Sequence, residues 1–155
     1  MKLELVRDWM TRDVITVTAV TALPDAYDLM TRNKIRRLPV VDEHGRLIGI
    51  VTYGDIRSAR PSPANALNIW ELNFMLARLS IAEIMTPDPL TISENATIGE
   101  AAQKMLEKTI GSLPVVDSQG NLVGIITESD IFRLVVHGWQ RSQQDPPEPY
   151  AHYGN

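Results

Sequence analysis

The chain has 155 residues, with 15 Lys or Arg against 19 Asp or Glu, so its formal net charge is −4. This is about the length of one domain, and 44% hydrophobic and 22% charged residues are typical of a soluble globular protein. The acidic balance argues against a nucleic-acid binder or a polybasic membrane-surface protein.

No apolar run reaches the ~18 residues of a membrane span, and the charged first residues lack the apolar stretch of a signal peptide. The lack of cysteine excludes disulfides and thiolate chemistry. We therefore expect a cytoplasmic α/β protein.

An internal repeat divides the chain. Leu38-Pro39-Val40-Val41-Asp42 recurs as Leu113-Pro114-Val115-Val116-Asp117, an offset of 113 − 38 = 75. Aligning 6–58 with 81–133 needs no gap and gives about 19 identities in 53 positions, where chance gives roughly three. One repeat is near the lower size limit for an independent core. We therefore expect the two copies to pack together as a pseudo-two-fold pair.

In chain order, each repeat begins with a Met-Thr turn, a short extended segment (14–17 and 89–92) and then a helix. In the first copy Thr21 is the expected cap, with Leu23, Ala26, Tyr27 and Met30 facing inward. In the second copy Thr97 and Glu100 fit a capping box, with an apolar face formed by Ile98, Ala101, Ala102, Met105 and Leu106.

Two buried strands joined by a tight turn follow the helix in each repeat. The strands are expected at 38–41 and 47–51, and at 113–116 and 122–126. Each turn ends in a glycine with positive φ, Gly45 or Gly120, and a second helix starts at Thr52 or Thr127. The predicted fold is α/β (α+β), with the order β-α-β-β-α occurring twice.

The predicted organisation has four parts. Residues 1–60 and 81–138 are the repeats, 61–80 a linker helix, and 139–155 a disordered tail rich in proline. The linker helix either packs on its own repeats or uses Trp70 and Phe74 in a subunit contact. Trp9, Trp70 and Trp139 are expected to be core or interface anchors.

Both repeats carry Gly-apolar-apolar-Thr-x-x-Asp where a buried strand meets a helix, ending at Asp55 and Asp130. The simplest interpretation is helix capping by Thr and Asp. The functional alternative uses the same geometry, because a helix N-terminus attracts an anion and a carboxylate can accept both hydroxyls of a ribose. The glycine, Gly49 or Gly124, would let a flat base approach the backbone.

The tandem Met-Thr, Leu-Pro-Val-Val-Asp and Gly-Ile-Val-Thr-x-x-Asp pattern resembles a pair of CBS motifs, a Bateman module, over about 6–58 and 81–133. The chain is similar to small stand-alone two-CBS proteins. The resemblance implies a regulatory, non-catalytic module that binds AMP, ADP, ATP or S-adenosylmethionine between the motifs, requires no cofactor, forms a homodimer and signals to a separate protein.

Residues carried over from the resemblance form two candidate sites. The first comprises Val14, Thr16, Ile35, Arg36, Arg37, Pro39, Thr52, Gly54 and Asp55. The second comprises Pro89, Thr91, Ile110, Ser112, Pro114, Thr127, Ser129 and Asp130. The aspartates would hold ribose hydroxyls and the threonines would face phosphate. No metal ligands are expected, since His44, His137 and His152 are scattered.

Charge separates the two repeats. Residues 6–58 hold 8 basic and 7 acidic residues (8 − 7 = +1), whereas 81–133 hold 3 and 8 (3 − 8 = −5). The basic cluster of Arg32, Lys34, Arg36 and Arg37 is either a solvated helix end or a phosphate-binding edge. In the second repeat Glu128 would repel phosphate. We therefore expect the Thr52/Asp55 site to take the phosphorylated ligand.

Two other functions compete with a nucleotide sensor. One is a structural homodimerisation module whose capping motifs bind no ligand. The other is an enzyme of unrecognised type. No sequence motif supports it, since the chain has no Gly-rich phosphate loop with Lys, no nucleophile elbow and no His-x-x-x-His pair.

Overall fold

A computed structural model describes residues 3–59 and 69–144. The first repeat comprises α1 (Val6–Trp9), β1 (Val17–Thr18), α2 (Leu23–Asn33), β2 (Arg37–Val41), β3 (Leu47–Thr52) and α3 (Tyr53–Ala59). Then follow α4 (Ile69–Arg78), α5 (Ile81–Ile84), β4 (Thr86–Pro87), β5 (Ile92–Ser93), α6 (Ile98–Lys108), β6 (Ser112–Val116), β7 (Leu122–Thr127) and α7 (Glu128–Gln144). The predicted β-α-β-β-α order therefore occurs in both repeats, with short additional elements.

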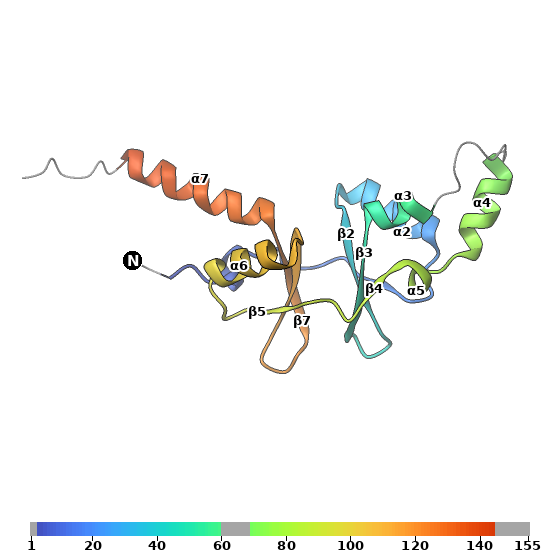
Figure 1. Ribbon diagram of the computed structural model, residues 1–155, viewed down its shortest axis with the longest axis horizontal. Coiled ribbons are helices and arrows are strands. Elements are labelled where there is room, and N and C mark those ends of the chain that lie inside the picture. The colour runs from blue at the N-terminus through green and yellow to red at the C-terminus, as the bar shows by residue number, and fades with distance from the viewer. Residues whose placement is uncertain (1–2, 60–68, 145–155) are drawn as a thin grey trace, which may run out of the picture.

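Two small sheets lie side by side, and most of the helices lie toward the same end of the strands (Figure 1). Their strand orders are β1-β2-β3-β4 and β5-β6-β7. In each, an antiparallel hairpin pairs with a short parallel strand, as Val17 opposite Val40 and Ile92 opposite Val115 illustrate. The hairpin turns contain Gly45 at φ +77° and Gly120 at φ +82°, as expected from sequence.

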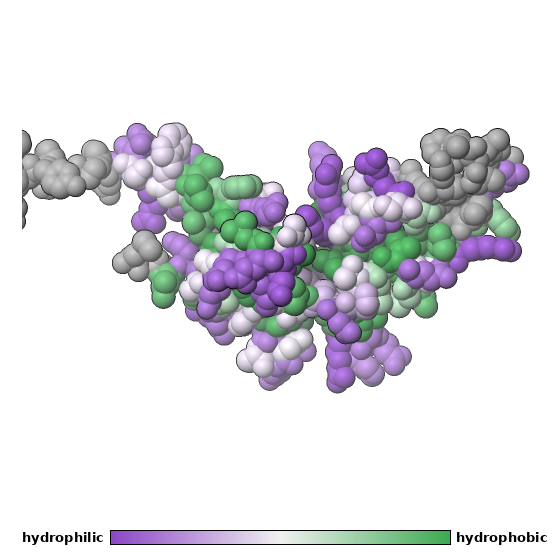
Figure 2. All heavy atoms as spheres, in the orientation of Figure 1, coloured by the Kyte–Doolittle hydropathy of each residue, from purple (hydrophilic) through white to green (hydrophobic). Residues whose placement is uncertain are grey.

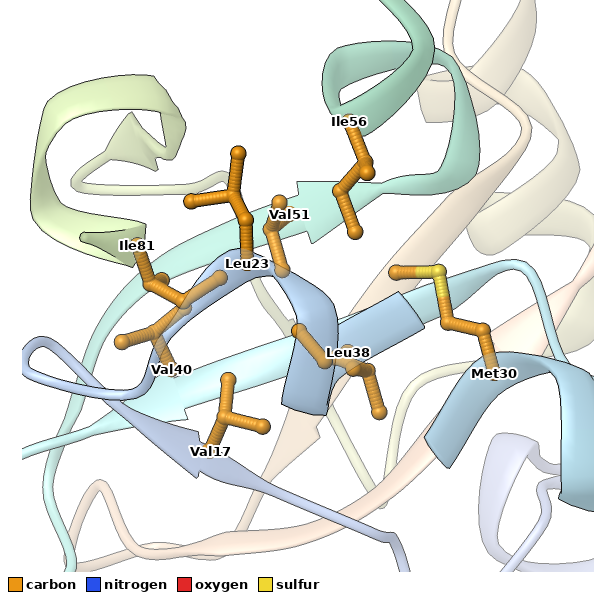
Figure 3. Close-up of a cluster of buried hydrophobic side chains, with 9 residues drawn as sticks. Val17, Leu23, Met30, Leu38, Val40, Val51, Ile56 and Ile81 are labelled. Carbon is orange, nitrogen blue, oxygen red and sulfur yellow. The ribbon is translucent and has the colours of Figure 1, made fainter. Parts of the chain in front are cut away.

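The start of each repeat crosses into the other half. β4 of the second repeat pairs with β3 of the first, and Thr11 forms a bridge with Ile125. Accordingly, Ile81 is buried in the first core (Figure 3), and Val6 belongs to the second. Neither half has a complete core without its partner. Each of the two cores therefore contains residues from the start of the other repeat.

The first long helix of each repeat differs in part from expectation. Thr97 and Glu100 form the predicted capping box on α6. On α2, however, the N-cap is Ala22, because the Thr21 hydroxyl instead accepts the Thr18 N–H at 3.1 Å. Leu106 is 82% exposed and lies outside the buried face of α6. Both helices end in a left-handed residue, Lys34 and Thr109.

The linker and the C-terminal segment also differ from expectation. Helix α4 occupies only part of the predicted linker helix at 61–80. Residues 61–68 of that range lie outside the described residues. It contacts α2, while Trp70 and Phe74 remain exposed. Residues 139–144 continue α7 instead of starting a disordered tail, because Gln and Arg favour helix and the first proline comes at 146. Residues 145–155 lie outside the described part of the chain.

Candidate functional site

Each Thr-x-x-Asp motif lies where a strand passes into a helix. The Thr52 N–H donates to Asp55 Oδ2 at 2.8 Å, and the Asp55 N–H donates to Thr52 Oγ1 at 3.1 Å, which is the reciprocal capping pattern. In the second motif the Thr127 N–H and hydroxyl both donate to Asp130 Oδ2, at 2.9 and 3.1 Å. The motifs thus serve as helix caps, and their carboxylates are held in fixed positions.

A cleft of about 330 Å³ opens beside the second of these motifs. This size is within the range of small-molecule sites. We call it the Asp130 cleft; it is lined by Thr11, Lys34, Ile35, Arg36, Arg37, Gly111, Ile125, Thr127, Glu128, Ser129, Asp130 and Arg133. It therefore combines the basic loop of the first repeat with the start of α7 in the second.

This combination differs from the grouping expected from sequence, which assigned each site to one repeat. Ile35, Arg36 and Arg37 share a cleft with Asp130, although Arg36 also keeps contact with its own repeat, since its carbonyl accepts the Tyr53 N–H at 2.8 Å. The physical reason is the crossing of the repeats, which brings the loop before β2 next to the start of α7. Lys34, Arg36 and Arg37 of the basic cluster thus line the same cleft as the second motif, while Lys34 and Arg36 also line a cavity beside Tyr53 in their own repeat.

The remaining residues of the first candidate set lie elsewhere. Val14 and Thr16 line a separate cavity of about 350 Å³, together with Leu122 and Val123. Thr52, Gly54 and Asp55 form the start of α3, with Asp55 half-buried. Pro39 is buried within β2 opposite Ile50.

The second candidate set is also divided. Thr127, Ser129 and Asp130 line the Asp130 cleft. Ser112 and Pro114 are buried in β6. Ile110 lines a groove of about 530 Å³ between α6 and α7. Pro89 and Thr91 precede β5, and the Thr91 carbonyl accepts the Lys104 ammonium at 2.6 Å.

Gly49 and Gly124 serve the crossing strands instead of a base. A Cβ on Gly124 would stand 2.6 Å from Met10 Sδ and 2.8 Å from the Thr11 carbonyl oxygen. A Cβ on Gly49 would stand 2.5 Å from Met85 Sδ. The space beside each glycine, where the sequence predicted that a flat base could approach, is therefore filled by the methionine of the opposite repeat.

Arg37 links the Asp130 cleft to the neighbouring groove. Its guanidinium lies over Gly111, where a Cβ would stand 2.6 Å from Nη2, and Glu128 Cδ is 3.5 Å from the same point. These three residues line both cavities. Arg36 is placed by Tyr53, with the guanidinium carbon 5.8 Å from the ring centroid. Both arginines thus line the cleft.

Six residues of the cleft were absent from the candidate sets: Thr11, Lys34, Gly111, Ile125, Glu128 and Arg133. Lys34 belongs to the basic cluster already singled out by charge. Arg133 lies three residues after Asp130, and residues at this spacing share a helix face, so the helix prediction could have indicated it. Thr11 and Gly111 reach the cleft because the repeats cross, and no local sequence pattern indicates that crossing.

The CBS domain model matches residues 6–62 and 81–137. The chain therefore belongs to the CBS-domain family and contains a pair of CBS domains. A CBS domain-containing protein of Dictyostelium discoideum is 36% identical over 132 residues, which cover 85% of this chain and 91% of the relative.

Two solved CBS pairs share the fold and contain adenosyl ligands. CBSX2 in complex with AMP, a protein of Arabidopsis thaliana, has a TM-score of 0.75 at 28% identity and covers 88% of this chain and 99% of its own. The CBS pair of protein MJ0100, in complex with 5′-methylthioadenosine and S-adenosylmethionine, has a TM-score of 0.74 at 33% identity, with the same coverage. These neighbours support a ligand-binding regulatory module.

Relatives named as enzymes match only in part, since this chain spans between 21% and 24% of their length. Their names therefore describe longer proteins. Separately, none of the helices in the described ranges is both long and apolar enough to cross a membrane.

Proposed function

We propose that this CBS pair is a regulatory module that binds an adenine nucleotide (AMP, ADP or ATP) in the Asp130 cleft. The observation that carries the proposal is the charge of the cleft lining. Lys34, Arg36, Arg37 and Arg133 contribute four positive charges, against two negative charges from Glu128 and Asp130. Guanidinium groups pair bidentately with phosphate oxygens, so this excess favours a phosphorylated ligand.

The same charge excess discriminates between the adenosyl ligands of the structural neighbours. S-adenosylmethionine carries a sulfonium and an ammonium against one carboxylate, so its net charge is positive, whereas AMP carries a phosphate that is mostly dianionic at neutral pH and is attracted by the net positive lining. We therefore favour a nucleotide over S-adenosylmethionine at Asp130. The Thr52/Asp55 position, which the sequence assigned to the phosphorylated ligand, is proposed to be the weaker phosphate site.

Matched carboxylate variants test the assignment of the cleft. Asp130→Ala and Asp55→Ala each remove the capping carboxylate of one motif, so each is the control for the other's loss of helix capping. Binding of AMP, ADP, ATP and S-adenosylmethionine is measured by calorimetry on both variants. We expect Asp130→Ala to abolish nucleotide binding and Asp55→Ala to retain it; the reverse pattern would return the site to the first motif.

A thermal-shift panel tests whether the chain binds a nucleotide at all. A ligand at 100 times its Kd stabilises the folded state by about 2.7 kcal/mol, which raises Tm measurably for a chain of this size. Stabilisation by AMP, ADP or ATP supports the proposal. If none of the nucleotides raises Tm, the structural alternative is favoured, a dimerisation module without ligand.

We also propose that the chain acts as a homodimer and signals to a separate protein. The dimer proposal is supported by an exposed apolar face on α6 and α7, formed by Leu106, Phe132, Val135, Val136 and Trp139. Green, hydrophobic spheres lie over the part of α7 nearer the sheets in Figure 2, whereas its far end is purple to white. Contiguous exposed apolar side chains typically mark an interaction site. A ligand bound beside this face could shift the dimer between two geometries that a partner distinguishes.

A further inference from the structure

Asp130 differs from Asp55 in what its second carboxylate oxygen binds. Thr127 occupies Oδ2, while Oδ1 accepts Arg133 Nη1 at 2.6 Å. The Asp130 side chain is only 4% exposed, and that of Arg133 is 69% exposed. Both carboxylate oxygens of this buried aspartate are therefore engaged, and Oδ1 is engaged by a group at the surface.

The first motif has no equivalent of this ion pair. The residue that corresponds to Arg133 under the 75-residue offset is Ser58. Thr52 occupies Asp55 Oδ2, and no described residue donates to Asp55 Oδ1. The two motifs are thus alike in capping but different in the availability of one carboxylate oxygen.

Arg133 also belongs to the cleft that Asp130 lines. Both residues border the same 330 Å³ space, with Lys34, Arg36 and Arg37 contributed by the other repeat. A guanidinium on an exposed, flexible side chain can exchange one oxyanion partner for another without moving the backbone. The side chain therefore has two possible anionic partners, the Asp130 carboxylate and a ligand phosphate.

We propose that Arg133 is a specificity-determining residue that selects phosphorylated ligands, an inference that rests on the proposed nucleotide function. A ribose hydroxyl that hydrogen-bonds Asp130 Oδ1 competes with Arg133 for that oxygen, because the Asp130 side chain is only 4% exposed and Arg133 Nη1 already lies 2.6 Å from Oδ1. The displaced guanidinium gains a new charged partner when the ligand carries a phosphate. With an unphosphorylated nucleoside the ion pair is broken without replacement, so that ligand binds weakly.

Arg133→Gln tests this exchange with AMP and adenosine as probes, by calorimetry on the full chain. Removing the guanidinium frees Asp130 Oδ1 and deletes one phosphate partner. We therefore expect adenosine to bind more tightly and AMP more weakly than in the wild type. The preference for AMP over adenosine should fall about tenfold or more, equivalent to about 1.4 kcal/mol. Arg141→Gln, an equal loss of charge on the same helix, should leave both affinities unchanged.

The sign of the adenosine result decides the inference. A general loss of positive charge, or a merely structural effect, would weaken AMP binding without tightening adenosine. If adenosine affinity does not rise in Arg133→Gln, the exchange is wrong, even where wild-type AMP binding is intact. If the wild type binds none of AMP, ADP and ATP, the proposed function is wrong, and this inference is wrong with it.

Discussion

Met10 and Gly124 lie in contact although they belong to different repeats: the methionine sulfur is 2.6 Å from the point where a Cβ on Gly124 would stand. The Thr11 carbonyl is 2.8 Å from the same point, and it accepts the Ile125 N–H at 3.0 Å. Glycine at 124 therefore allows the N-terminal segment to cross onto β7. The pair marks where the two halves depend on each other.

Gly124→Ala should destabilise the protein because the new methyl group meets a backbone oxygen as well as a flexible side chain. Overpacking of this kind costs about 1–3 kcal/mol, and each 1 kcal/mol lowers Tm by about 2–4 °C for a chain of this size. Thermal unfolding followed by circular dichroism measures the change. Gly138→Ala is the control, since a Cβ there meets nothing within 4 Å and alanine favours helix. Equal Tm values for the two variants would contradict the prediction.

Local patterns were sufficient to predict most of each repeat. The Leu-Pro-Val-Val runs, the turns at Gly45 and Gly120 and the capping box at Thr97 are all determined by neighbours within a few residues, and the structure contains each of them. Helix α7 extends past the predicted start of the tail at residue 139, because the proline-rich composition of the tail begins only at Pro146.

The arrangement of the site was not predictable in the same way. Arg37 and Asp130 line one cleft only because each repeat crosses into the other half. No periodicity, capping residue or charge run records that crossing. Repeat-by-repeat assignment therefore grouped the basic cluster with Asp55, although the threonine and aspartate types were correctly placed at helix starts.

The turn aspartates predict a pH dependence of the two hairpins. The backbone N–H of Asn121, followed by its side-chain amide, holds the pKa of Asp117 below its ordinary value of 3.8. The Arg46 N–H does the same for the pKa of Asp42. Because these folded-state pKa values are depressed, the stabilisation is present above the unfolded value and is lost as the pH falls through the folded one.

NMR titration of the Asn121 amide resonance from about pH 6 to about pH 2 covers the range in which carboxyl groups protonate. We expect a midpoint below 3.8 in the wild type. Asp117→Asn should remove this titration and leave that of the Arg46 amide unchanged. A midpoint at or above the ordinary value would mean that the turn does not stabilise the ionised carboxylate.

Thr109 offers a stabilising substitution. It ends α6 with φ +54°, a left-handed conformation that costs an L-residue roughly 1–2 kcal/mol and that glycine adopts readily. Thr109→Gly should therefore raise the free energy of unfolding by up to about 1 kcal/mol, after the greater chain entropy of glycine is deducted. Urea denaturation measures this gain, and Thr109→Ala, which keeps the Cβ, should not show it. An equal gain in both variants would place the effect elsewhere.

The exposed face of α6 and α7 predicts a dimer that one added charge should dissociate. Phe132 is 66% exposed and Val135 60% exposed, so in a monomer neither side chain supports the core. Phe132→Asp places an unpaired carboxylate in the proposed interface, where burial of a charge is costly. Light scattering coupled to size exclusion should give twice the chain mass for the wild type and the chain mass for the variant. Val20→Asp, at an 85% exposed position on the other half, should remain dimeric. A monomeric wild type, or a Phe132→Asp protein that stays dimeric, would remove this face as the interface.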